Sequence, residues 1–140
     1  MAKKDILTPQ SVPSCASVNL LRMKIFFLYL IAVFFIFAGV SHFLKPGMFL
    51  GIMPKFLPFP LQLVYISGIC EILFAILLVV PATRQAGAWL LILLLLAVFP
   101  ANIQMEVSFY HEKNAYLWIA LLRLPLQFAL IWWVWIYTKP

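Results

Sequence analysis

The stretch LQLVYISGICEILFAILLVV, residues 61–80, decides the fold of this chain. It is apolar over nearly its whole length and lacks the regular alternation of polar and apolar residues that a membrane β-strand shows. An α-helix needs about 20 residues of this kind to cross the hydrocarbon core of a bilayer. The stretch therefore predicts a transmembrane helix, and it places the carboxylate of Glu71 inside the membrane.

The composition of the whole chain also indicates a membrane protein. Of its 140 residues, 66% are hydrophobic and 10% are charged, whereas soluble domains are typically about 45–50% apolar and about 25% charged. The mean hydropathy is +1.07. A soluble fold of this length cannot bury so much apolar surface, so the water-soluble classes of protein are excluded.

The apolar runs predict an all-α integral membrane fold, a bundle of four transmembrane helices. Residues 1–20 form a polar, partly disordered leader, and residues 21–140 form the membrane domain. Residues 45–60 are rich in proline, which cannot continue a helix. We therefore expect an irregular or short-helical segment between the first two helices, which lies at the membrane interface or folds back over the bundle. The four helices are expected at about residues 23–44, 61–80, 85–105 and 116–137.

The distribution of basic residues predicts the orientation. The leader, the 81–85 turn and the C-terminus lie at one end of the bundle, and the 106–114 loop lies at the other. The first end carries more basic residues, namely Lys3, Lys4, Arg22, Lys24, Arg84 and Lys139. Positive charge marks the cytoplasmic side of membrane proteins. Both termini are therefore expected to be cytoplasmic, and the net charge of +6 is read as topology and not as a nucleic-acid surface.

Glu71 needs a partner inside the membrane, and Arg123 is the one that the sequence predicts. Glu71 lies about 11 residues, or roughly 16 Å, below the outer end of its helix, and Arg123 about 8 residues, or roughly 12 Å, below the outer end of the last helix. An unpaired ion at such a depth costs at least about 2.5–3.5 kcal/mol. The pair would be either a structural contact that sets the helix register or part of a functional site.

Every predicted helix contributes a polar group to the outer half of the bundle. This asymmetry predicts a polar cavity that opens outward or to the outer leaflet. Ser67 and Gln127 could complete the hydrogen bonds of the ion pair, Gly68 would let a neighbouring helix approach closely, and Pro100 would free a carbonyl in its helix. The alternative for Asn102 and Gln104 is that their amides join helices and contact no ligand. The candidate site residues are His42, Glu71, Asn102, Gln104, Arg123 and Gln127, supported by Ser67, Gly68 and Pro100.

Motifs for other kinds of chemistry are missing from the sequence. His42 and His111 are isolated, so no metal site is predicted, and there is no phosphate-binding glycine loop or haem-attachment motif. Cys15 and Cys70 should lie at different depths, which predicts no disulfide between them. No cofactor motif is evident, and a quinone is the one cofactor class that the sequence leaves open.

Four segments, which together span about residues 35–130, resemble the DoxX-like family of small bacterial membrane proteins. They are FAGVSHFLKPGMFLGIMPKFLPFP at 37–60, SGICEILFAILLVVPATR at 67–84, FPANIQM at 99–105 and LRLPLQ at 122–127. The resemblance implies a four-helix bundle in the bacterial inner membrane. It also implies a redox context, because some members are subunits of a thiosulfate:quinone oxidoreductase and others are associated with redox-defence assemblies.

Two functions follow as expectations. The first is a membrane subunit of a redox-associated complex, whose outward-facing polar site binds a quinone or a small anion and whose partner protein supplies electrons. The second is a non-enzymatic scaffold that binds lipid or assists the assembly of another membrane protein. Oligomerisation is compatible with both functions. Catalysis itself is not decided by the sequence.

Overall fold

The computed structural model describes residues 15–51, 58–113 and 117–139. Within these ranges the chain is helical and contains no strand. Four of its helices are long and apolar enough to cross a membrane, which confirms the predicted all-α fold with four membrane helices. The elements are α1 (Cys15–Leu44), α2 (Pro46–Leu50), α3 (Pro60–Val79), α4 (Arg84–His111), α5 (Leu117–Trp135) and the 3-10 helix η1 (Ile136–Thr138).

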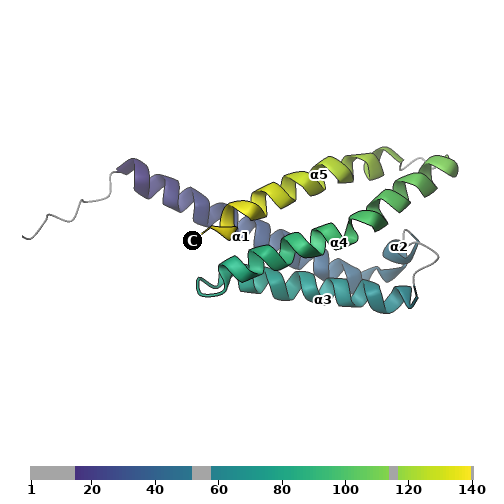
Figure 1. The fold of residues 1–140 in the computed structure, drawn as a ribbon, viewed down its shortest axis with the longest axis horizontal. Helices are drawn as coiled ribbons and strands as arrows, with labels where there is room; N and C mark the ends of the chain where they lie inside the picture. The colour runs from purple at the N-terminus through teal and green to yellow at the C-terminus, as the bar shows by residue number, and fades with distance from the viewer. Residues whose placement is uncertain (1–14, 52–57, 114–116, 140) are drawn as a thin grey trace, which may run out of the picture.

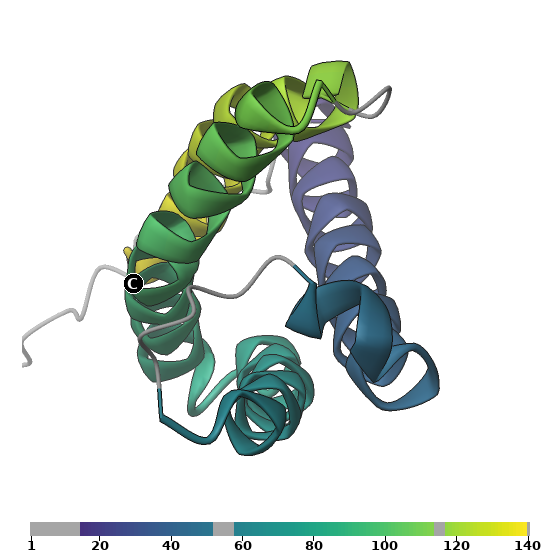
Figure 2. The ribbon, with the colours of Figure 1, turned by 90° about the vertical axis from the view of Figure 1, so that its right-hand side faces the viewer.

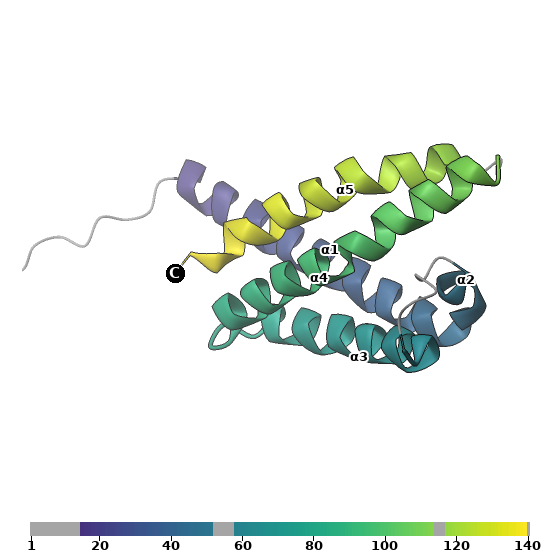
Figure 3. The same ribbon diagram turned by 45° about the vertical axis from the view of Figure 1, so that its right-hand side comes forward.

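The long helices run alternately up and down (Figure 1). The start of α1, the turn between α3 and α4, and the C-terminus lie at one end, which we call the inner end. The short helix α2 and the start of α3 lie at the opposite, outer end (Figure 3). The predicted arrangement of the two ends is therefore correct.

Proline sets several helix boundaries. Pro46 and Pro60 occupy the first turns of α2 and α3, where the missing N–H would have no intrahelical partner in any case. Val80, which precedes Pro81, has the extended backbone (φ −70°, ψ 121°) that a following proline favours. Thr83 Oγ1 donates to the Leu77 carbonyl over 2.9 Å and so satisfies one of the free carbonyls at the end of α3.

The helices α1 and α4 are longer than predicted. Residues 15–20, assigned to the leader, already belong to α1, and residues 106–111, assigned to a polar loop, continue α4. Polarity alone does not end a helix, and neither segment contains glycine or proline. Of the proline-rich segment, residues 46–50 are helical, and residues 52–57 lie outside the described part of the chain.

The hydrophobic core is concentrated towards the inner end. Its buried members include Leu28 and Phe35 from α1, Leu78 from α3 and Leu91 from α4. Nearby, the Tyr137 hydroxyl donates to the Lys24 carbonyl over 2.9 Å and joins η1 to α1. Towards the outer end, α5 and the second half of α4 diverge from the pair formed by α1 and α3 (Figures 1 and 2). The polar residues of the outer half are therefore divided between two separate helix pairs.

Candidate functional site

The first polar cluster depends on a close crossing of α1 and α3 at two glycines. A Cβ atom added to Gly39 would lie 2.7 Å from the Gly68 carbonyl oxygen, and one added to Gly68 would lie 2.9 Å from the Gly39 carbonyl oxygen. Only residues without a side chain allow the two backbones to approach so closely. The crossing brings the next turn of α1, which carries His42, against the turn of α3 that carries Glu71.

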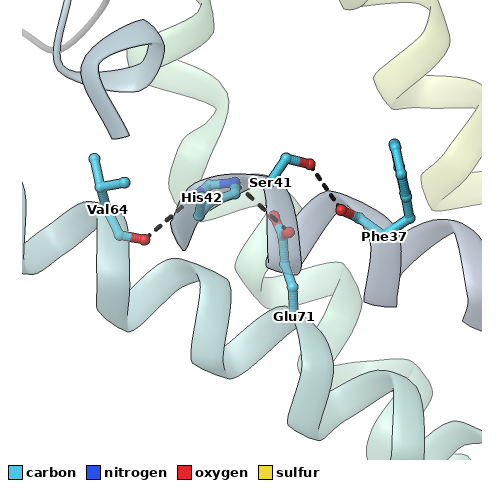
Figure 4. Close-up of polar contacts among 5 residues, drawn as sticks. All are labelled: Phe37, Ser41, His42, Val64 and Glu71. Atoms are coloured by element: carbon cyan, nitrogen blue, oxygen red, sulfur yellow. Dashed lines mark hydrogen bonds and ion pairs between the residues drawn. The ribbon is translucent and has the colours of Figure 1, made fainter. Parts of the chain in front are cut away.

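His42 lies between two acceptors on α3 (Figure 4). Its Nδ1 lies 3.1 Å from the carbonyl oxygen of Val64, and its Nε2 lies 3.6 Å from Oε2 of Glu71. The neighbouring Ser41 does not take part, because its hydroxyl donates to the Phe37 carbonyl of its own helix over 2.7 Å. The imidazole thus connects the backbone of α3 to a carboxylate on the same helix.

The two contacts restrict where protons can reside. A carbonyl oxygen only accepts, so the hydrogen bond to Val64 requires a proton on Nδ1 of His42. Nε2 of His42 and Oε2 of Glu71 attract each other only if one further proton is present, either on the imidazole or on the carboxylate. With that proton, the pair is neutral overall, either as an imidazolium and a carboxylate or as an imidazole and a carboxylic acid. The pair can therefore hold one proton and release it, and it carries no net charge while the proton is bound.

The site is enclosed but still reaches the molecular surface. The side chains of His42 and Glu71 are each 12% exposed. The ring of Phe49, from α2, stacks on the imidazole with 3.9 Å between the ring centroids and 22° between the planes. The short helix α2 therefore covers one face of the histidine.

Two polar atoms beside the imidazole have unused hydrogen-bonding capacity. Ser67 Oγ and Glu71 Oε2 are buried and have no hydrogen-bond partner among the described residues. They lie one turn apart on the same face of α3. Buried polar atoms are normally satisfied, and an exception calls for an explanation such as a water or a ligand. A small polar group bound here would have a hydroxyl and a carboxylate available to it.

The predicted pairing of Glu71 with Arg123 is wrong. In the described part of the chain Glu71 faces His42, whereas the guanidinium of Arg123 lies 3.8 Å from the sulfur of Met105 on α4. The physical reason is the order of the helices, because α3 packs on α1 and α4 while α5 packs mainly on α4. The depth of a residue along its helix follows from the sequence, but the direction in which its side chain points does not.

The second polar cluster joins α4 to α5 at Gln127, which is only 3% exposed. Asn102 Nδ2 donates to Oε1 of Gln127 over 2.8 Å, and Nε2 of Gln127 donates to the Leu95 carbonyl. This carbonyl is adjacent to that of Leu96, which loses its usual helical donor at Pro100. The reading of Asn102 as a link between helices therefore holds, and its partner is Gln127, which was expected beside the Glu71–Arg123 pair. Gln127 does not serve the Glu71 site.

Replacing Gln127 with leucine is expected to lower the free energy of unfolding by about 1–3 kcal/mol, because Asn102 would lose its buried acceptor. Thermal unfolding in detergent micelles would measure the change. Gln104→Leu is the matched control, since Gln104 is half-buried on α4 and its side chain makes no hydrogen bond with the described residues. Equal losses for the two variants would contradict the importance of the link between α4 and α5.

The hollow found near the outer end does not surround the predicted site. It lies between the end of α4 and the start of α5, has mainly apolar walls and includes Glu106 and His111. Neither His42 nor Glu71 lines it. The expectation of one polar cavity fed by all four helices is therefore replaced by two polar clusters and a separate hollow.

Several contributors to these sites escaped the sequence reasoning. Phe49 and Glu106 were not among the predicted site residues, and the Val64 carbonyl carries no sequence signal at all. The spacing of Gly39 and His42 on one helix and of Gly68 and Glu71 on another was the available clue, because each pair is separated by three residues and so shares a helix face. Metal ligands do not gather within the described ranges, since no three His, Cys, Asp or Glu side chains come together there.

Comparison with known proteins gives one match. Residues 31–138, which include all four membrane helices in whole or in part, match the model of a family described as a domain of unknown function, DUF8561. No curated protein and no solved structure matches the chain.

Proposed function

This chain belongs to the DUF8561 family, and we propose that it is the membrane subunit of a redox-associated complex, in which His42 and Glu71 bind the head group of a quinone. The observation that carries the proposal is the geometry of this pair, whose facing atoms lie 3.6 Å apart. Its location in the outer half of a membrane bundle also supports the proposal, because an intramembrane ionisable residue is by default a functional candidate.

The chemistry of a quinone suits these groups. A quinone carbonyl oxygen accepts a hydrogen bond, and Nε2 of His42, which faces Oε2 of Glu71 over 3.6 Å, is a donor when it carries the proton of the pair. Reduction of a quinone to a quinol takes two electrons and two protons. A partner redox protein would supply the electrons, the His42–Glu71 pair would deliver one proton to a quinone oxygen, and water at the outer face would supply the second proton and reload the pair. Phe49 offers an aromatic face beside the imidazole.

A small anion is the less favoured ligand for this site. Arg123, the one cation among the predicted site residues apart from His42, lies against Met105 on the α4–α5 pair and not beside Glu71. The carboxylate would also repel an anion at the His42 site. We therefore favour a neutral carbonyl-bearing head group at His42, and any anion bound by Arg123 would occupy a different place.

The proposal is tested by measuring equilibrium binding of decylubiquinone to the purified protein in lipid nanodiscs. His42→Phe and Glu71→Gln are expected to weaken binding at least tenfold, because each removes the donor or the group that holds its proton. His111→Phe is the matched control, because this histidine is exposed at the end of α4. The control variant should bind decylubiquinone as tightly as the wild type does. Unchanged binding by His42→Phe would overturn the quinone proposal.

The second candidate is a lipid-binding scaffold or an assembly factor for another membrane protein. The observation that favours it is the apolar-walled hollow between α4 and α5, which offers space for an acyl chain. Co-purification of one membrane complex, together with normal binding of decylubiquinone by His42→Phe, would favour this role over the first.

The distribution of basic residues and the resemblance to the DoxX-like family support a proposal for the location and ancestry of the chain. We place it in a bacterial inner membrane with both termini cytoplasmic, as the positive charge at the inner end predicts, and regard it as related to the DoxX-like proteins. Cys15 is exposed at the start of α1, so a membrane-impermeant thiol reagent tests the orientation. Labelling of Cys15 in intact cells would contradict it.

A further inference from the structure

The hollow between α4 and α5 has the properties of a second binding site. Its volume is about 510 Å³, within the usual range for small-molecule sites, about 300–1,000 Å³. Its walls come from Val107, Leu117 and Leu121 together with the ring of Tyr110. These residues lie where the outer ends of α4 and α5 meet, away from the contact between α1 and α3 (Figure 2). An apolar chain can pack against such walls.

The one carboxylate in the hollow has an unsatisfied oxygen. Glu106 Oε1 is buried and has no hydrogen-bond partner in the ranges that the structure describes. Neither does any cation there form an ion pair with this residue. Leaving such an atom without a donor is costly, and more so when the group is charged. Glu106 is also one of the residues that line the hollow, so a ligand there that supplies an N–H group to this carboxylate would recover this energy.

The surroundings indicate which donor fits. A carboxylate and an aromatic ring both attract a cation, and Tyr110 is 70% exposed at the rim of the hollow. A primary ammonium carries N–H donors for Glu106, whereas a quaternary ammonium has none.

We propose that this hollow binds an amphiphile with a primary ammonium head, which pairs with Glu106 while its alkyl chain lies against Leu117 and Leu121. The ligand is either a membrane lipid with an aminoethyl head group or a free alkylamine, which share this chemistry. The site is separate from His42 and Glu71, and it does not depend on the quinone proposal.

The test uses a dodecylammonium probe with a photoreactive group on its chain, bound to the full-length protein in nanodiscs of phosphatidylcholine and phosphatidylglycerol. Labelled peptides are identified by mass spectrometry. We expect labelling in the segment with Leu117 and Leu121, and at least a tenfold loss of labelling with Glu106→Gln. Glu112→Gln is the matched control, because Glu112 is an exposed carboxylate at the end of the same helix and should label normally.

Two further arms identify the head group and its source. An alcohol with the same photoreactive chain should label wild type and Glu106→Gln equally and weakly. Adding phosphatidylethanolamine should reduce probe labelling if the ligand is a lipid, whereas labelling that resists this lipid and yields to free dodecylamine would assign the free amine. Equal labelling of wild type and Glu106→Gln by the ammonium probe would overturn the proposal, provided that both proteins show the same thermal unfolding.

Discussion

Alanine at either crossing glycine, Gly39 or Gly68, is expected to lower the free energy of unfolding by about 1–3 kcal/mol. The added methyl group would lie 2.7 Å from the Gly68 carbonyl oxygen in the first case and 2.9 Å from the Gly39 carbonyl oxygen in the second. Both obstacles are backbone atoms, so no side-chain rotation relieves them, and α1 and α3 must move apart. The same movement would separate His42 from Glu71, so quinone binding should weaken in parallel with stability.

Gly47→Ala in α2 is the matched control for these two variants. A methyl group added at Gly47 meets no atom within 4 Å, and alanine is favoured over glycine inside a helix by about 1 kcal/mol. The control should therefore be neutral or slightly stabilising. Unfolding in mixed micelles, followed by the tryptophan fluorescence of α5, would measure all three. If Gly39→Ala and Gly68→Ala were as stable as the control, the close crossing of α1 and α3 would be contradicted.

The second large effect is an energetic coupling between His42 and Glu71. We expect a double-mutant cycle with His42→Gln and Glu71→Gln to give an interaction energy of about 0.5–3 kcal/mol, as for other residues in contact. The Glu71→Gln change alone leaves Nε2 of His42 without a proton-sharing partner, and the His42→Gln change alone leaves a carboxylate of low exposure without its counterpart. The double variant replaces both with neutral amides and should be more stable than the sum of the two single losses predicts.

A parallel cycle with Arg123 separates this arrangement from the one that the sequence predicted. Arg123 and Glu71 lie on helices that do not pack extensively on each other. The effects of Glu71→Gln and Arg123→Gln should therefore add to within about 0.3–0.5 kcal/mol. The free energies of unfolding of the four proteins in each cycle provide the comparison. A larger coupling for Arg123 than for His42 would show that the guanidinium is the true partner of Glu71.

The two glycines and the ion pair are parts of one arrangement. The crossing at Gly39 and Gly68 brings α1 and α3 close enough for the imidazole to reach both the Val64 carbonyl and the Glu71 carboxylate. If α1 and α3 lay farther apart, His42 and Glu71 would each lose its partner. An unpartnered polar group in an apolar medium raises the free energy of the folded state considerably. Packing of small residues and satisfaction of polar groups therefore stabilise the same contact.

The positions of the membrane helices were predictable because hydropathy is a local property. Whether a run of about 20 apolar residues can cross a bilayer depends on the residues of that run alone. For this reason α3 at Pro60–Val79 matches the predicted 61–80 closely. Helix ends were less predictable at Cys15 and His111, where amphipathic or polar segments continued the helix. The abundance of polar residues in the outer half was also visible in the sequence.

What the sequence by itself determined is the membrane class, the four helices, their alternating direction and the residues that must find partners inside the apolar bundle. Only the tertiary structure decided which partner each one found. Glu71 meets His42, and Gln127 meets Asn102 and the Leu95 carbonyl, because α5 packs on α4 while α3 crosses α1 at the glycines. Hydrophobicity along the chain places a residue at a depth, but the neighbour it contacts depends on how the helices are ordered and rotated about their axes, which is set by side-chain packing between them.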